Sequence, residues 1–442
     1  MKAPTAPAVR RPPRAPGGLP VLGHAVRLAR SPLEFLDAQR SHGDVVEFRI
    51  GRRPAYLLNH PDLVLALLTG PGGRFDRGEI FTKAHPLFGT GVAVADGTHH
   101  RDRRRAVQPL LSAARLPGYI DTMARLVAAR ADSWRHGQDI DLNAETAGLA
   151  LDAVARTLFG HPLPDGFADT VHRALPTVVT GLGLRAYGPA AALLDRWPGG
   201  ERRRYRSALA SVHGVVDSLV EANPHTPALT RLSAGTGQRQ LHDDVTSLLI
   251  GGSHTSGAAA AWLFILLSRH PEIRRRVRGE VTGVVGDRPV EPGDLPALVL
   301  TGHVVRETLR LYPPIWLFPR CAADDVELGG HRFTRGAQIF YSPYALHRDP
   351  RWYRSPGTFD PDRWDPDRHP APPRGAYLPF AAGVHGCPGG DFALAELTLL
   401  AAAVTRRWHL DPLPGVRARP LAAATLGPAP LTMTVTTRPN ER

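Results

Sequence analysis

Residues 243–269 are the feature that most limits how this chain can fold. The segment is long and apolar, with the pattern of a helix that is buried along most of its length. Its longest unbroken run of small and apolar residues, 257–267, is too short to span a bilayer. Such a helix must be covered by other elements of the same protein, so we expect it at the centre of a large core.

Most of the remaining sequence is also helical in pattern. We predict helices over residues 33–39, 101–111, 122–136, 145–158, 166–184, 202–222, 271–285, 298–311 and 391–408. Residues 44–59 alternate apolar and polar side chains around a GRRP turn, which indicates a β-hairpin, and residues 326–342 form a second strand-like region. We therefore expect a mainly α fold with small β-sheets, in which residues 15–442 form a single domain after a flexible, basic, Pro-rich tail, residues 1–14.

Composition excludes several classes of protein. Cys321 and Cys387 are the only cysteines and lie far apart in sequence, which excludes a disulfide scaffold and favours a reducing cytosol. The first 18 residues hold no apolar stretch, so we expect no secretory signal, no membrane anchor and a cytoplasmic protein. The formal net charge is +13, but no basic stripe is interleaved with aromatic residues, so nucleic acid is the least expected partner.

Cys387 lies in a Gly-rich loop, FAAGVHGCPGG, that leads directly into a predicted helix. The N–H groups and dipole of a helix N-terminus lower the pKa of a nearby thiol and favour the thiolate. Glycines let backbone amides approach the sulfur closely, and such N–H···S bonds tune a metal-bound thiolate. A buried structural cysteine explains neither the glycines nor the histidine of this loop, whereas a metal-binding thiolate explains both.

This loop resembles the haem-binding signature of the cytochrome P-450 family in its residues Phe380, Gly383, His385, Cys387, Gly389 and Ala393. The resemblance extends over nearly the whole chain and implies the family's mainly helical prism fold. It also implies haem b, with Cys387 as the iron ligand and with Phe380 and Gly389 beside the cofactor. Ala381 stands where the family usually has glycine, and we expect this small-for-small change to leave haem binding intact. Cys321 has no comparable surroundings, and we interpret it as structural.

Three further segments resemble the family. Glu307 and Arg310 resemble its ExxR helix, and Arg363 resembles the arginine that completes a structural triad on the thiolate side. On its own, an ExxR pattern usually means a solvated salt bridge. The resemblance also implies haem-propionate contacts for residues that supply cations or N–H donors, namely His100, Arg104, Arg320 and His385. For Arg101, Arg103 and Arg105 we predict a solvated basic face instead.

The predicted central helix carries the sequence GGSHTS in its middle, from Gly251 to Ser256. The family has a small pair, an acid and a threonine here, and the last two manage oxygen and protons. Gly251, Gly252 and Thr255 match, but His254 replaces the acid. We predict Thr255 as the oxygen-side hydroxyl. His254 either relays protons in place of the acid or turns away to contact substrate or helix.

The substrate pocket is expected in the family's variable parts, residues 78–95, 165–200, 248–255, 315–318 and 424–426. Our candidates for its wall are Gly252 and a set of apolar residues, Phe81, Leu87, Phe88, Leu249, Ile315, Leu317 and Leu426. An apolar wall favours a hydrophobic substrate that is bound largely by burial. The sequence FDRGEIFTKAHPLFGTGVAVADG is similar to bacterial terpene-oxidising members, so a terpenoid is the favoured substrate.

We therefore predict a soluble bacterial monooxygenase that inserts one oxygen atom from O2 by hydroxylation or epoxidation in secondary metabolism. Oxidative coupling, ring closure and peroxide-driven oxidation at the same haem are alternatives, although Thr255 argues against peroxide. A haem-binding protein without turnover is a further alternative. No flavin or nicotinamide fingerprint is evident, so we expect electrons from NAD(P)H through ferredoxin reductase and an acidic ferredoxin, which would dock near Arg101, Arg103 and Arg105. We expect a monomer.

Overall fold

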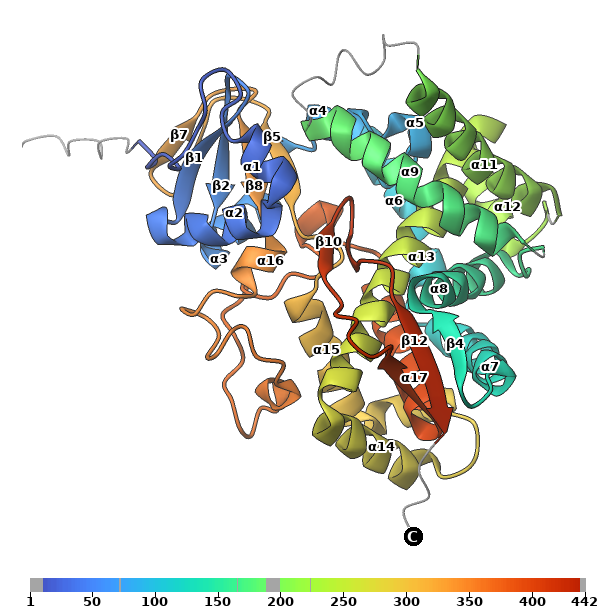
Figure 1. Ribbon diagram of the computed structural model, residues 1–442. Coiled ribbons are helices and arrows are strands. Elements are labelled where there is room, and N and C mark those ends of the chain that lie inside the picture. The colour runs from blue at the N-terminus through green and yellow to red at the C-terminus, as the bar shows by residue number, and fades with distance from the viewer. Residues whose placement is uncertain (1–10, 71–72, 165, 188–198, 223, 438–442) are drawn as a thin grey trace, which may run out of the picture.

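A computed structural model describes residues 11–70, 73–164, 166–187, 199–222 and 224–437, and shows a mainly helical molecule with a small sheet at one side (Figure 1). Most of the expected tail, residues 1–10, lies outside the described residues. The last residues of the expected tail already pair with strand β1, because the N–H of Glu47 donates to the carbonyl of Pro13 at 2.8 Å.

Helices, 3-10 turns and strands alternate along the chain. The α-helices are α1 (Ala25–Arg30), α2 (Pro32–Gln39), α3 (Pro61–Thr69), α4 (Glu79–Thr82), α5 (His85–Phe88), α6 (Gly97–Val107), α7 (Leu116–Ser133), α8 (Leu142–Phe159), α9 (Phe167–Tyr187), α11 (Gly200–Ala222), α12 (Pro227–Ser233), α13 (Gln238–Arg269), α14 (Pro271–Val285), α15 (Val299–Leu311), α16 (Pro343–Leu346) and α17 (Gly390–Arg407). The 3-10 turns are η1 (Arg40–His42), η2 (Gln108–Leu111), η3 (Pro292–Ala297), η4 (Pro361–Trp364) and η5 (Gly383–His385). The strands are β1 (Val45–Ile50), β2 (Arg53–Leu58), β3 (Phe75–Asp76), β4 (Gln138–Asp141), β5 (Phe318–Ala322), β6 (Val326–Leu328), β7 (His331–Phe333), β8 (Gln338–Tyr341), β9 (Trp408–Pro412), β10 (Pro420–Ala422), β11 (Leu426–Pro428) and β12 (Thr432–Thr437).

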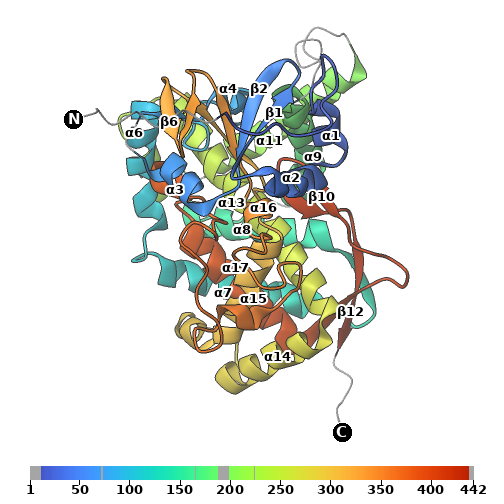
Figure 2. The ribbon, with the colours of Figure 1, turned by 90° about the vertical axis from the view of Figure 1, so that its left-hand side faces the viewer.

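Helix α13 is the core of the molecule, as its sequence predicts. It is long and apolar enough to cross a membrane by length and composition, but 72% of its most apolar window is buried inside the protein. Helices α8, α15 and α17 pack around it (Figures 1 and 2). At Gly257 a Cβ would lie 2.9 Å from the Cα of Ala147, so glycine is what allows α8 to approach α13 this closely.

The sheets are small and lie outside the helical core. The largest has the strand order β1-β2-β8-β5-β3, with β1 and β2 forming the predicted hairpin around Gly51. One face is buried against α1 and α2, and the other against α3 and the β6–β7 hairpin, which gives two further apolar clusters. Sheet β4-β12-β9 and hairpin β10-β11 lie near the C-terminal part of the chain.

The predicted helices are confirmed, with ends that shift by a few residues. Sequence patterns missed α3, which begins where the His60 ring accepts from the N–H of Asp62 and Pro61 occupies the first turn. They also missed the sheet β4-β12-β9. Its strands pair residues 138–141 with residues 432–435, and no local periodicity reports a pairing over that separation.

Candidate active site

Cys387 lies between η5 and the N-terminus of α17, in the loop that the sequence singled out. The loop is closed by a hydrogen bond from the N–H of Cys387 to the carbonyl of Phe380 at 2.8 Å. Gly389 is the N-cap residue of α17. Although Cys387 as a residue is exposed, protein atoms around its sulfur desolvate the thiolate and raise the pKa of Cys387. The N–H of Gly389 and the charge of Arg104 act to lower this pKa, as expected for a helix N-terminus, but our expectation of a net lowering is wrong.

The backbone of this loop explains its glycines. At Gly383, where φ is +70°, a Cβ would lie 2.0 Å from the carbonyl oxygen of Leu68, so glycine is obligatory there. Ala381 also has a positive φ, +56°. Its change from the family's glycine therefore concerns backbone conformation as well as size.

Helix α6 carries His100 and Arg104 to the same loop. The guanidinium of Arg104 donates to the carbonyl of Gly386 at 2.5 Å. The rings of His100 and His385 lie 4.4 Å apart between centroids, and His385 Nε2 is 3.2 Å from Asp96 Oδ1. Burial and the neighbouring His385, Arg77 and Arg104 lower the pKa of His100 to about 3, so this imidazole is neutral at neutral pH.

Arg77 and Arg320 add two buried cations to this cluster. Burial lowers the pKa of Arg77 to about 9, helped by the like charge of Arg320, and burial also lowers the pKa of Arg320. Nε of Arg77 is enclosed and has no hydrogen-bond partner among the described residues. Sequence reasoning missed Arg77, although an arginine directly after FD and directly before the variable segment 78–95 was the available signal.

This cluster fits an anionic group. Arg77, Arg104 and Arg320 converge, and the charge of Asp96 acts on Arg77 and Arg320 to favour their charged forms. Burying several cations is costly unless an anion compensates them. The pair of propionates on haem is an anion of this kind, and the four predicted contacts, His100, Arg104, Arg320 and His385, all lie in or beside the cluster.

The middle of α13 is open on one side although the helix is otherwise core. Gly251 is exposed, and nothing lies within 4 Å of the position that its Cβ would take. Gly252 was our predicted wall residue, but its Cβ position faces Val154 of α8 at 3.1 Å. Gly251 is the glycine whose Cβ position borders open space, and Gly252 stays a prediction as a wall residue.

Thr255 and His254 have different hydrogen-bond partners. The Thr255 hydroxyl donates back to the carbonyl of Gly251 at 2.8 Å, one helical turn away. His254 Nε2 lies 2.9 Å from the hydroxyl oxygen of Thr425, in the turn between β10 and β11. Burial lowers the pKa of His254 to about 4, with a smaller contribution from His172. The ring is therefore neutral, and one of its nitrogens is engaged by Thr425.

Glu307, Arg310 and Arg363 form the predicted structural cluster, and it is buried. Arg310 binds both carboxylate oxygens of Glu307, at 2.7 and 2.8 Å, and the side chains of both residues are fully buried. Arg363 Nε is 3.4 Å from Glu307 Oε1. Arg310 also donates to the carbonyls of His347, Pro356 and Thr358, so the pair joins α15 to the long loop before the cysteine.

The apolar wall candidates divide by exposure. Phe81, Phe88, Ile315 and Leu317 are half-buried, and the ring of Phe81 lies under the Arg77 guanidinium at 4.8 Å. The side chains of Leu87, Leu249 and Leu426 expose 1%, 0% and 0% and are packed in hydrophobic clusters. These three leucines therefore have almost no exposed surface in this structure, and their role in the wall stays a prediction. The part of the expected variable segment at residues 165 and 188–198 lies outside the described residues.

The basic face expected for Arg101, Arg103 and Arg105 is present only in part. Arg103 is not solvated, because it is 5% exposed and pairs with Asp244. Arg101 and Arg105 are exposed as expected.

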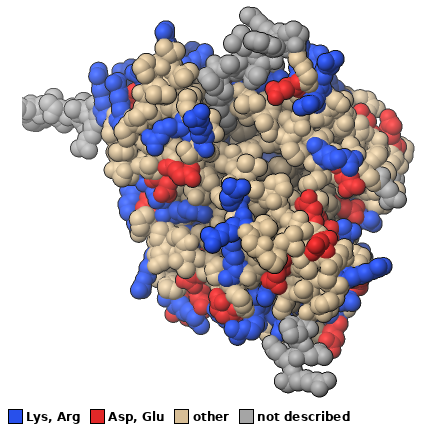
Figure 3. Space-filling view, viewed as in Figure 1, with Lys and Arg blue, Asp and Glu red and all other residues tan. Residues whose placement is uncertain are grey.

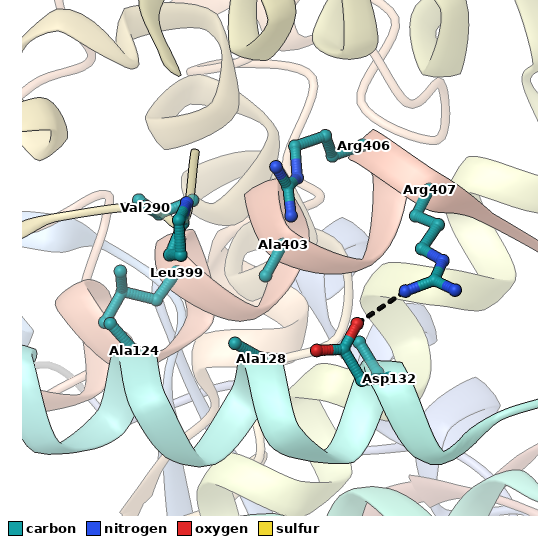
Figure 4. A pocket seen from close by; sticks show the side chains of 10 residues that line it. Ala124, Ala128, Asp132, Val290, Leu399, Ala403, Arg406 and Arg407 are labelled. Carbon is teal, nitrogen blue, oxygen red and sulfur yellow. Dashed lines mark hydrogen bonds and ion pairs between the residues drawn. The ribbon is translucent and has the colours of Figure 1, made fainter. Parts of the chain in front are cut away.

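A small hollow of about 20 Å³ lies between α7 and α17, beside the Arg407–Asp132 ion pair (Figure 4). It has room for roughly one water molecule, so it is no substrate site.

Together, the helical prism, the cysteine loop and the cationic cluster define a haem-thiolate protein. Comparison with known proteins agrees: residues 12–433 match the family model described as cytochrome P-450, and the chain belongs to that family. It therefore works with haem b, O2 and reducing equivalents from NAD(P)H delivered by redox partners, as a monooxygenase of hydrophobic small molecules.

Several curated relatives are similar over almost their whole length. The chain is 37% identical to cyclooctatin synthase of Streptomyces melanosporofaciens, over 95% of this chain and 94% of the relative. It is 36% identical to cyclooctat-9-en-7-ol 5-monooxygenase of the same organism (91% and 90%) and 36% identical to pentalenene oxygenase of Streptomyces avermitilis (93% and 94%). Among solved structures, a mutant cytochrome P-450 haem domain aligns with a TM-score of 0.82 at 23% identity, over 97% of this chain and 98% of that chain, which supports the fold.

Proposed function

We propose that this monooxygenase acts on a cyclic terpenoid in secondary metabolism. The observation that carries the proposal is the similarity to pentalenene oxygenase and cyclooctat-9-en-7-ol 5-monooxygenase over nine-tenths or more of the chain. The half-buried apolar side chains of Phe88, Ile315 and Leu317 agree with a substrate that is bound by burial.

In this proposal Cys387 would bind the haem iron through its sulfur, and Phe380 and Gly389 shape the loop of that cysteine. The cationic cluster would hold the propionates through His100, Arg104, Arg320, His385 and Arg77. When bound, haem supplies the activation of O2 with two electrons delivered singly. The buried cluster of Glu307, Arg310 and Arg363 keeps the thiolate side rigid and does no chemistry.

Thr255 is the proposed oxygen-side hydroxyl. It is the side chain that α13 presents one turn beyond the open face of Gly251, and its hydroxyl can exchange its bond to Gly251 for one to a water molecule. To relay protons, His254 needs one ring nitrogen connected to solvent and the other connected to the oxygen side. The bond between Nε2 and Thr425 supports the other role, in which His254 belongs to the pocket wall.

The proposed electron donors are a ferredoxin and its reductase, and the proposed setting is a cytoplasmic monomer with residues 15–442 as one domain. Lys and Arg side chains are spread over the face seen in Figure 3 and are interleaved with acidic ones. A local basic surface on α6 therefore matters more than the net charge of the whole molecule. Arg101 and Arg105 are exposed there, and Arg103 no longer belongs to this surface.

A screen of cyclic terpene hydrocarbons and alcohols tests the substrate class. Binding is read from the spin-state shift of the haem-loaded enzyme, and incorporation from ¹⁸O2 with the reconstituted redox chain. Thr255→Ala should lose coupling and release peroxide while it still binds substrate. His254→Ala should stay coupled and bind substrate less tightly. A loss of coupling in this variant would instead support the role of His254 as a proton relay. The absence of any shift across the panel contradicts the terpenoid proposal.

A further inference from the structure

His254 and Thr425 form a polar pair between the middle of α13 and the turn between β10 and β11. The two residues are 171 positions apart, yet His254 Nε2 and Thr425 Oγ1 lie within hydrogen-bond distance, at 2.9 Å. Leu426, next to Thr425, is fully buried, whereas the neighbours of His254 along α13 are polar. Ser253 and Thr255 bond back to carbonyls of their own helix, at 2.6 and 2.8 Å, whereas His254 reaches across to another element.

The turn that carries Thr425 is held rigidly. The indole N–H of Trp262 donates to the carbonyl of Leu426 at 3.1 Å, and that of Trp316 donates to the carbonyl of Ala423 at 2.7 Å. The N–H of Leu426 donates to the carbonyl of Pro314 at 2.8 Å. Two tryptophans and one backbone bond therefore fix the direction of the Thr425 hydroxyl toward α13.

The second ring nitrogen of His254 is left available. No hydrogen bond from the described residues reaches Nδ1 of His254. This nitrogen is also not fully enclosed by the protein. His254 is half-buried on the same stretch of α13 as the open face of Gly251. The neutral ring therefore presents one donor or one acceptor toward open space.

A hydroxyl group suits this atom better than other polar groups. The Thr425 hydroxyl can donate to Nε2 or accept from it, so Nδ1 is correspondingly a donor or an acceptor. A hydroxyl pairs with either form, whereas a carbonyl pairs with the donor alone. A carboxylate is an acceptor only, so it too pairs with the donor form alone. A hydrocarbon that displaces water from Nδ1 leaves it unpaired.

We infer that His254 and Thr425 form an anchor for a hydroxyl group already present on the terpenoid substrate. This inference rests on the proposed function and narrows its substrate class to a terpene alcohol. It also places the reaction after a step that installs that hydroxyl. Such a step is either an earlier oxygenation or a cyclisation that ends by capture of water.

Matched pairs of ligands test the anchor in the haem-loaded enzyme. The pairs are cedrane with cedrol, bornane with borneol, and p-menthane with menthol, each titrated by the spin-state shift. Because an alcohol is less hydrophobic than its hydrocarbon, the informative quantity is the ratio of the two Kd values and its change between variants. Thr425→Val and His254→Leu each remove one half of the anchor. Ser253→Ala is the matched control, because its hydroxyl is buried and bonded to the carbonyl of Leu249.

The expected result is that the ratio of hydrocarbon Kd to alcohol Kd falls about threefold to tenfold in Thr425→Val and His254→Leu, as for one lost hydrogen bond, and is unchanged in Ser253→Ala. His254→Gln, which keeps a donor and an acceptor, should retain part of the preference. A ratio that is the same in wild type, Thr425→Val and His254→Leu overturns the anchor and leaves the terpenoid proposal standing. Failure of every pair to shift the spectrum contradicts the proposed function itself.

Discussion

Arg103 of α6 and Asp244 of α13 form a buried ion pair, with Nη2 and Oδ2 2.7 Å apart and the two side chains 6% and 0% exposed. Asp244 also accepts from the backbone N–H of Val92 at 3.1 Å, and Arg103 donates to the carbonyl of Leu232. The pair therefore joins α6, the loop before it and α12 to the central helix. Of these elements, α6 carries His100 and Arg104 of the cationic cluster.

Removing one partner of this pair should be strongly destabilising, since it leaves the other charge buried and unpaired. We expect Arg103→Ala to lower the free energy of unfolding by about 3–5 kcal/mol. Arg101→Ala, an exposed neighbour on the same helix, should change it by less than about 0.5 kcal/mol. Denaturant unfolding of both variants checks the difference, and equal midpoints would show that the pair is not buried.

The same helix gives a prediction about electron delivery. Reversing Arg101 and Arg105 together to glutamate should slow reduction by an acidic ferredoxin several-fold, because both arginines are exposed and raise the encounter rate. The wild-type rate should fall as salt is added, and the salt dependence should weaken in the variant. Arg204→Glu on α11 is a control with the same change of charge sign elsewhere. Stopped-flow reduction that ignores both salt and the double reversal would rule out this surface.

Cys387 gives a spectroscopic prediction. The reduced, carbon monoxide-treated wild type should show the thiolate-type spectrum, and Cys387→Ser should lose it because serine provides no thiolate. Cys321→Ser, in β5, should keep the spectrum. If the two variants behave in the opposite way, the assignment of the ligand is wrong.

Ala381 is strained by its positive φ, so replacing it should stabilise the protein. A left-handed conformation costs a residue with a Cβ roughly 1–2 kcal/mol, part of which the extra freedom of glycine in the unfolded chain offsets. We expect Ala381→Gly to raise the free energy of unfolding by about 0.5–1 kcal/mol. Ala382, with φ −154°, is the matched control, and Ala382→Gly should destabilise. A lower melting temperature for Ala381→Gly than for wild type would contradict the strain.

The parts of the site that could be predicted from sequence are those whose residues are close together in the chain. The loop from Phe380 to Gly389 is one continuous segment, and its glycines and capping helix are visible in the letters. Glu307 and Arg310 are one helical turn apart, so their pairing also follows from spacing. The long apolar pattern of α13 predicted its central position.

The remaining features depend on contacts between distant segments. Arg101, Arg103 and Arg105 look alike in sequence, and only Asp244, 141 residues away, makes Arg103 a buried residue. Arg77 joins the cationic cluster through folding alone, as does the pairing of β4 with β12. The residue that faces Gly252 depends on how α8 packs against α13. The partner of His254 depends on a hairpin near the C-terminus.

Glu396 of α17 gives a pH-dependent prediction. This carboxyl is buried against α13, and its Oε2 has no hydrogen-bond partner among the described residues. Burial raises the pKa of Glu396 to about 8, although a hydrogen bond with Ser256 acts to lower it. In the unfolded chain a glutamate has a pKa of about 4.3. Between these two values the folded state holds a proton that the unfolded state releases.

Stability should therefore be fully present below about pH 4.3 and fall as the pH rises toward 8, by about 1.4 kcal/mol for each pH unit at most. Glu396→Gln keeps a neutral polar group of the same shape and removes this titration. The variant should be more stable than wild type by about 1 kcal/mol near pH 5 and by several kcal/mol near pH 8. Glu272→Gln, at the exposed start of α14, should show no such pH-dependent gain. Denaturant unfolding of the haem-loaded proteins at pH 5, 6.5 and 8 measures the difference, and a gain from Glu396→Gln that is independent of pH would show that Glu396 is ionised in the folded protein.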